Sequence, residues 1–249
     1  MIDTHCHICD PVFDADRQAV IDRARAAGVH GIVAVGESMQ DARRNLSLSD
    51  RHPEIRPTAG LYPTFLDQDA AEKMRAFIRQ NRDRLTAIGE VGLDYWAVQE
   101  RADKTLQCEI LIGFIDLARE IDLPLNVHSR SAGRHAVSLL IEKGARRVQM
   151  HAFDGKAGAA MPAVEAGYFF SIPPSVTRSR QKQKLVRSLP LSALLIETDS
   201  PVLGPNPEKR NEPANAVFVL ETIAEIKNER PETVAEAVAE NTRRLYGDG

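Results

Sequence analysis

Apolar segments of strand length alternate with amphipathic segments of helix length throughout this chain, and this alternation constrains the fold more than any other feature. It occurs eight times, which is typical of a parallel sheet whose strands are joined by helical crossovers. The predicted helices include residues 15–27, 70–84 and 104–121, and two more, 214–227 and 231–245, follow the last strand. The predicted strands are residues 1–7, 31–35, 56–60, 86–90, 124–128, 147–151, 168–172 and 193–197.

The chain has 249 residues, a length that suits one large α/β domain or two smaller ones. No linker, low-complexity tract or repeat beyond the strand-helix unit interrupts the sequence, so we expect a single domain over residues 1–249. Eight such strands form either a closed TIM (β/α)8 barrel or an open doubly wound sheet. Polar residues at the ends of many strands favour the barrel, because all the strand ends of a barrel converge on one face.

Six side chains of metal-binding type stand at or just after the carboxyl ends of the predicted strands. His5 and His7 are separated by one residue, so on a strand both imidazoles point to the same side. A lone strand-end histidine is more often a hydrogen-bonded core residue. Burying four imidazoles and two carboxylates together, however, is costly without a metal. We therefore predict six metal ligands: His5, His7, Glu90, His128, His151 and Asp199.

This ligand set suits two divalent ions. Six ligands are too many for one tetrahedral zinc, and they include too few carboxylates for calcium. Glu90 is the expected bridge between the ions. Asp199 is expected to bind one ion and to accept the proton of the nucleophilic water, so these two carboxylates are the predicted catalytic residues. Four imidazoles favour zinc, manganese or iron.

Charge, hydropathy and cysteine content exclude other classes. A net charge of -3 argues against a protein that holds nucleic acid by bulk electrostatics, so any phosphate recognition must be local. The three cysteines cannot all pair, and we expect them to be reduced. The sequence contains neither a run of roughly 20 apolar residues nor a signal sequence. We therefore expect a cytoplasmic protein that does not bind membranes.

Five short motifs together resemble the TatD deoxyribonuclease family of amidohydrolase-like barrels. Each motif alone is weak, but five in this order at strand ends are highly specific. The resemblance covers essentially the whole chain. The motifs are Thr4-His5-Cys6-His7, Ile88-Gly89-Glu90-Val91-Gly92-Leu93-Asp94, Asn126-Val127-His128-Ser129-Arg130, Met150-His151-Ala152-Phe153 and Glu197-Thr198-Asp199-Ser200-Pro201.

The resemblance implies a metal-dependent nuclease, with exonucleolytic removal of nucleotides from DNA as the usual activity and magnesium as the usual ion in assays. The expected partner is DNA, as a single strand or a strand end, and no obligate protein partner is inferred. The resemblance also implies how the ligands are grouped. One ion lies among His5, His7, Glu90 and Asp199, and the other lies among Glu90, His128 and His151.

Three residues near the strand ends are predicted to shape the substrate site. Tyr62 stands where the family usually has a histidine, so it offers a hydroxyl or a stacking face instead. Asp94 is expected to accept a hydrogen bond that orients a ligand histidine. Phe153 is a candidate stacking face for a base, although a loop aromatic is more often a lid on the core.

Two arginines are candidates for phosphate binding. Arg130 follows a predicted ligand by two residues and is expected to clamp a phosphate, with pairing to Glu197 or another nearby carboxylate as an equal alternative. Arg178 lies in the basic segment 177–184 after the seventh strand, where barrels often bind phosphate. A solvated basic helix face is the commoner explanation of such a run.

Two other functions stay open at the level of sequence. A small-molecule hydrolase acting on an ester, lactone or amide would use the same activated water, and the net negative charge and Tyr62 favour it. The aromatic residues and Arg130 favour the nuclease instead. A catalytically silent scaffold with a structural zinc is the second alternative, and the complete ligand set argues against it.

Overall fold

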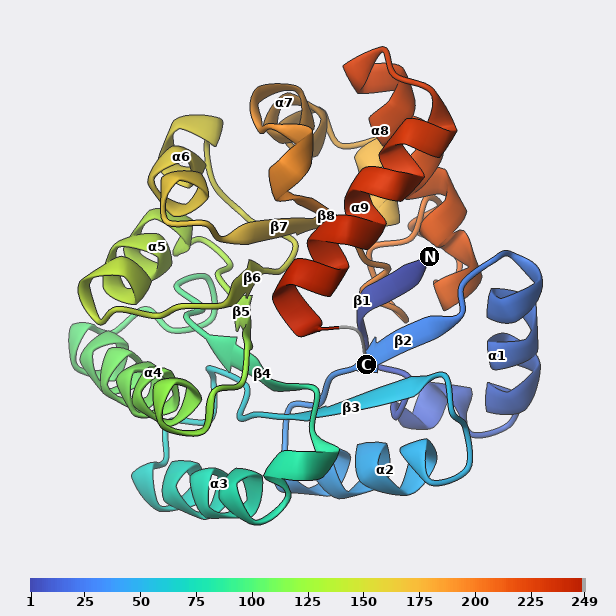
Figure 1. Cartoon of the computed structure of the whole chain (residues 1–249). Helices are drawn as coiled ribbons and strands as arrows, with labels where there is room; N and C mark the ends of the chain where they lie inside the picture. The colour runs from blue at the N-terminus through green and yellow to red at the C-terminus, as the bar shows by residue number, and fades with distance from the viewer. Residues whose placement is uncertain (248–249) are drawn as a thin grey trace.

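Eight parallel strands surrounded by helices form a TIM barrel in the computed structural model, which describes residues 1–247 (Figure 1). The strands follow chain order around the sheet, so the (β/α)8 barrel predicted from the alternation is confirmed. No strand boundary differs by more than two residues from its prediction. The strands are β1 (Ile2–Cys6), β2 (Gly31–Ala34), β3 (Ile55–Ala59), β4 (Ala87–Gly92), β5 (Leu125–His128), β6 (Val148–Met150), β7 (Phe169–Ile172) and β8 (Leu194–Ile196).

Apart from α9, the helices form the outer ring, and they bury apolar residues on their inner faces. In α3, for example, Ala71, Met74 and Ile78 are buried, and the Asp67 side chain caps the first turn. The predicted helix 70–84 ends earlier, at Gln80, and a short 3-10 helix follows it. The helices are α1 (Arg17–Ala26), α2 (Met39–Ser49), α3 (Gln68–Gln80), α4 (Arg101–Ile121), α5 (Gly133–Glu142), α6 (Ala157–Glu165), α7 (Arg180–Ser188), α8 (Ala216–Lys227) and α9 (Pro231–Tyr246).

The barrel closes between β8 and β1 through the residues that follow each strand. The Thr4 hydroxyl donates to the Ile196 carbonyl at 2.9 Å, within the barrel wall. Beyond the strand end, the Asp199 N-H donates to the His5 carbonyl, also at 2.9 Å, and the His7 N-H donates to the Ser200 carbonyl. These backbone bonds place the segment after β8 directly beside the histidines of β1.

A polar network fills the barrel interior beneath this closure. The last helix, α9, lies across the barrel in Figure 1, and its Tyr246 hydroxyl donates to Gln149 Oε1 at 2.6 Å. Asn126 Nδ2 donates to the same hydroxyl at 3.2 Å. Gln149 Nε2 donates to Ser171 Oγ at 2.8 Å. Because buried polar groups need partners, Tyr246 holds the amides of β5 and β6 in fixed orientations.

The described residues form no disulfide, and Cys6 and Cys9 are buried thiols. Burial raises the pKa of the Cys9 thiol to about 12. Among residues 1–247, no helix is long and apolar enough to cross a membrane.

Removing the Tyr246 hydroxyl should weaken the fold. In Tyr246→Phe, Gln149 Oε1 loses its donor inside the barrel, so the free energy of unfolding should fall by about 1 to 3 kcal/mol. Tyr95→Phe is the matched control, because its hydroxyl contacts only the weakly accepting sulfur of Cys108, at 3.6 Å. Urea denaturation of the metal-free proteins measures both. Equal midpoints for the two variants would contradict the role given to Tyr246.

Candidate metal centre

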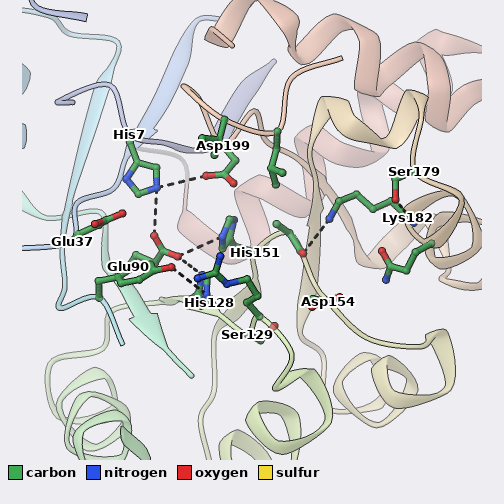
Figure 2. A pocket seen from close by; sticks show the side chains of 16 residues that line it. His7, Glu37, Glu90, His128, Ser129, His151, Asp154, Ser179, Lys182 and Asp199 are labelled. Carbon is green, nitrogen blue, oxygen red and sulfur yellow. Dashed lines mark hydrogen bonds and ion pairs between the residues drawn. The ribbon is translucent and has the colours of Figure 1, made fainter. Parts of the chain in front are cut away.

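The six predicted ligands converge at the carboxyl ends of the strands (Figure 2). His5 lies on β1 and His7 just beyond it, Glu90 lies on β4, and His128 ends β5. The other two ligands, His151 and Asp199, follow β6 and β8. Five of the six are buried with at most 8% of their surface exposed, and His7 is partly buried. The barrel therefore gathers residues from almost 200 positions of sequence into one cluster.

The first group of ligand atoms surrounds a common point. His5 Nε2 and His7 Nε2 lie 3.3 Å apart, and each lies 3.5 Å from Asp199 Oδ1. Glu90 Oε2 lies 3.4 Å from His7 Nε2. Two tetrahedral donors that each lie about 2.0 to 2.1 Å from a zinc ion are separated by about 3.3 Å. The spacing of these four side chains therefore fits a divalent ion.

The other oxygen of Glu90 belongs to a second group. Glu90 Oε1 lies 2.7 Å from His128 Nδ1 and 3.4 Å from His151 Nε2. These three side chains form a possible metal-binding group, as do His5, His7 and Glu90. Because Glu90 presents one oxygen to each group, it has the geometry of a bridging carboxylate.

Three of the histidines have a hydrogen-bond acceptor at the ring nitrogen that faces away from the cluster. Asn126 Oδ1 accepts from His5 Nδ1 at 2.8 Å, and this direction is fixed because the Asn126 amide nitrogen donates elsewhere. The imidazole then carries its proton on Nδ1, and the Nε2 lone pair faces the centre. Such acceptors orient ligand histidines and fix their tautomers.

Carboxylates support the other two histidines. Glu197 Oε2 lies 3.2 Å from His151 Nδ1, and Asp94 Oδ2 lies 3.1 Å from His128 Nε2. Glu197 is fully buried, and it also accepts from Ser171 Oγ at 2.6 Å and from the Ala152 N-H at 2.9 Å. Glu197 is therefore part of the site, although it was not a predicted site residue.

A signal for these supporting residues does exist in the sequence. Asn126 stands two positions before His128, and Glu197 stands two before Asp199. Alternate residues of a strand share a face, so a polar residue two positions before a ligand points into the same barrel interior.

Burial and charge set the protonation of the cluster. Burial would raise the pKa of Glu90, but hydrogen bonds from His128 and His7 hold it well below its usual value. Likewise, burial opposes ionisation of Asp199, but the charge of His151 and a hydrogen bond from His7 keep its pKa low. Burial lowers the pKa of His5 to about 4. Both carboxylates are therefore ionised at neutral pH, and His5 is neutral, as a ligand must be.

Arg130 and Tyr62 meet on Asp94 at one side of the centre. Arg130 donates to Asp94 Oδ2 from Nη2 at 2.6 Å and from Nε at 2.9 Å, so it pairs with this carboxylate and not with Glu197. Its guanidinium also stacks 4.3 Å above the Trp96 ring. The Tyr62 hydroxyl donates to the same Asp94 oxygen at 3.3 Å. Burial would raise the Asp94 pKa, but hydrogen bonds from His128 and Arg130 hold it well below its usual value.

The structure places two predicted substrate contacts away from the cavity. Phe153 is 1% exposed, and its ring packs edge-on against Phe170, so it offers no stacking face and the prediction for it is wrong. The physical reason is close packing, because the ring fills the space beside two glycines where no side chain would fit. Arg178 donates to the Gly204 carbonyl at 3.3 Å and does not line the cavity.

A cavity of about 590 Å³ opens over the cluster. Glu37 and Lys182, neither of which was a predicted site residue, line the cavity, and Figure 2 shows them at opposite sides of the view. A volume of this size is typical of pockets that take small molecules. The lining residues are His7, Glu37, Tyr62, Glu90, His128, Ser129, Arg130, His151, Ala152, Asp154, Ser179, Gln181, Lys182, Asp199, Val202 and Leu203.

Known proteins resemble this chain over its whole length. The family model described as TatD related DNase matches residues 2–247. The human protein named Deoxyribonuclease TATDN3 is 44% identical, over 99% of this chain and 94% of the human protein. A Bacillus subtilis (strain 168) protein, Uncharacterized metal-dependent hydrolase YabD, is 35% identical over 99% and 98%. The crystal structure of YjjV, a TatD homologue from Escherichia coli K12, matches with a TM-score of 0.92 and 28% identity, over 100% of this chain and 98% of that one.

Zinc binding should release protons, because protonated histidines must become neutral to bind a metal. Burial disfavours the charged form of His128, but Asp94 and Glu90 overcome it and raise the pKa to about 9. The metal-free imidazole is then protonated at neutral pH. Zinc affinity should rise with pH, by about tenfold per unit for each proton released, at least up to the His128 pKa of about 9.

Titration calorimetry in buffers of different ionisation enthalpy measures this release. His128→Ala is the test variant, and it should release fewer protons than the unmodified protein. His135→Ala, at an exposed position on α5, is the control and should match the unmodified protein. Zinc affinity that stays constant between pH 7 and pH 9 would contradict the expectation.

Proposed function

Because this chain belongs to the TatD related DNase family, we propose that it is an exonuclease that hydrolyses phosphodiester bonds at DNA ends with two divalent ions. Within this proposal, the coarser statement is secure: the protein is a metal-dependent hydrolase acting on ester bonds. The finer statement that two ions act together rests mainly on Glu90. Its two oxygens face separate groups of imidazoles, which is the arrangement that a pair of ions requires.

The proposed ligands are the six converging residues. His5, His7 and Asp199 would hold one ion, His128 and His151 the other, and Glu90 both. Bound divalent ions would lower the pKa of a water molecule to about 7 and offset negative charge on a phosphate. Zinc, magnesium and manganese are the candidate ions, and the four imidazoles favour zinc or manganese.

Asp199 is the proposed general base. Its carboxylate is ionised at neutral pH, and its Oδ1 faces His5 and His7, which leaves Oδ2 to accept a proton from the attacking water. The carboxylate lines the cavity, where Figure 2 shows the His7 imidazole in contact with both Asp199 and Glu90.

Arg130, Tyr62 and Asp94 are proposed to position the substrate. Asp94 fixes the Arg130 guanidinium and the Tyr62 hydroxyl at the cavity wall, and Trp96, which is 64% exposed beside them, offers a face on which a base can stack. A cavity of about 590 Å³ admits the end of a strand more readily than the middle of a duplex, which supports the exonuclease. The net charge of -3 agrees with such local recognition.

The first test is hydrolysis of an end-labelled single-stranded DNA oligonucleotide. Metal-stripped protein resupplied with zinc, magnesium or manganese should shorten the strand progressively from one end. Asp199→Asn should lower the rate at least about 100-fold, because it removes the proposed base. Release of mononucleotides, followed by gel electrophoresis, distinguishes this activity from internal cleavage.

A lack of cleavage with every metal would overturn the nuclease. Tyr62 and the cavity carboxylate Glu37 favour the second candidate, a hydrolase of small uncharged esters or lactones, because an added carboxylate repels phosphate. Burial raises the pKa of Glu37, which softens that repulsion. Turnover of p-nitrophenyl acetate or a lactone, without cleavage of DNA, would support this candidate.

Metal content tests the proposed pair of ions. The unmodified protein should bind two equivalents of zinc. His128→Ala should keep about one, because the group around His5 and His7 stays intact, whereas Glu90→Gln should weaken both sites. Elemental analysis after equilibrium dialysis gives the stoichiometry, with His135→Ala as the control at an exposed position. One equivalent in the unmodified protein would contradict the two-ion proposal.

A further inference from the structure

Lys182 extends from the first turn of α7 into the cavity beside the metal centre (Figure 2). Ser179 caps this helix by accepting from the Lys182 N-H at 3.3 Å, which fixes where the helix begins. The Lys182 ammonium donates to the Ala152 carbonyl at 3.2 Å. Ala152 directly follows the ligand His151, so the ammonium lies at the edge of the ligand cluster.

The ammonium has no counter-ion in the described part of the chain, because its one hydrogen bond goes to a carbonyl. The other cation lining the cavity, Arg130, is already neutralised by its close pair with Asp94. An ammonium has three donors, so two remain for a ligand. Lys182 is therefore the cation of the cavity whose charge no protein group cancels.

The carboxylates around Lys182 are committed to other partners. Glu197 accepts from His151, Ser171 and the Ala152 N-H. Asp154 Oδ2 accepts from the Ser131 N-H at 2.9 Å, and Asp199 faces the imidazoles of β1. These charges act on Lys182 only from a distance, and burial still lowers its pKa. Lys182 is partly buried, and a partly buried cation without a paired anion is unfavourable, so an anionic ligand would relieve that cost.

We propose that Lys182 binds a phosphate oxygen of the substrate in the cavity beside the metal centre. The inference rests on the proposed function, because it assigns the residue that selects phosphate esters for that same site. Lys182 lies after β7, the region of a TIM barrel that often holds phosphate. Its charge offsets the cavity carboxylates Glu37 and Asp154, which would otherwise repel a nucleotide.

Lys182 is the cation of the basic segment 177–184 that lines the cavity. Because α7 begins at Arg180, the helix turns Lys182 towards the cavity and leaves Arg178, Arg180 and Lys184 exposed. Successive helical residues are about 100° apart, so residues two apart point to different sides. Lys184 therefore provides a matched control on the same helix.

The experiment measures binding of inorganic phosphate and of deoxyadenosine monophosphate to the zinc-loaded protein by titration calorimetry. Lys182→Met keeps the length of the side chain and removes its charge, and it should raise the Kd of both probes roughly 10- to 100-fold. Lys182→Arg should recover part of the affinity. Lys184→Met should bind like the unmodified protein.

Zinc content and Tm are measured for each variant, so that a lost fold or metal site is recognised. If Lys182→Met does not fold, Lys182→Gln replaces it, because its amide is polar but carries no charge. A Kd for phosphate within twofold of the unmodified protein would overturn the proposal, and so would the absence of phosphate binding by the unmodified protein.

Two substrates separate this inference from the proposed function. Lys182→Met should lose activity towards bis(p-nitrophenyl) phosphate and keep activity towards p-nitrophenyl acetate, which has no phosphate. If the unmodified protein leaves DNA intact while Lys182 still governs phosphate binding, the exonuclease is wrong and the phosphate site stands. If DNA is cleaved and Lys182→Met behaves normally in both binding and cleavage, the exonuclease stands and this inference is wrong.

Discussion

The site depends on one buried carboxylate, that of Glu90, which lies between two groups of imidazoles. A charge this deeply buried is stable only when it is paired, and its two oxygens are paired on opposite sides, with His7 and with His128. Neither group is complete without Glu90, since it belongs to a possible metal-binding group on each side. The strand that carries Glu90 must therefore hold its position relative to β1 and β5 closely.

The barrel interior provides that precision through hydrogen bonds. A continuous chain of bonds starts at His5 and runs through Asn126, Tyr246 and Gln149, and then passes through the Ser171 hydroxyl to Glu197 and His151. Every donor in this chain has an acceptor, so the orientation of one ligand is connected to that of another across the floor of the site. Many TIM barrels fill this space with branched apolar side chains. Here polar residues replace part of that apolar packing, and their hydrogen bonds orient the ligands.

Arg130 and Lys182, which both line the cavity, have different surroundings. The site can therefore bind a substrate in one preferred orientation. Arg130 is held between Asp94 and the Trp96 ring. Its charge is therefore already paired, and its guanidinium has a fixed position at the cavity wall. Lys182 approaches from α7 and has no paired anion among the described residues. A substrate with a base and a phosphate matches this asymmetry, since the base can stack beside Arg130 while the phosphate meets Lys182.

The sequence alone determined the barrel and the set of converging ligands, because strand-length periodicity and strand-end polar residues are local patterns that the parallel topology brings together. Tertiary structure decided what local patterns do not encode. Phe153 is the last residue of a ligand motif, yet close packing against two glycines buries its ring. The basic segment after β7 contains several cations, and the exact start of α7 selected Lys182 over Arg178 for the cavity. Arg130 had two alternatives, and only the fold placed Asp94 within reach. In each case the outcome depends on packing and helix phase, which are set by neighbours distant in sequence.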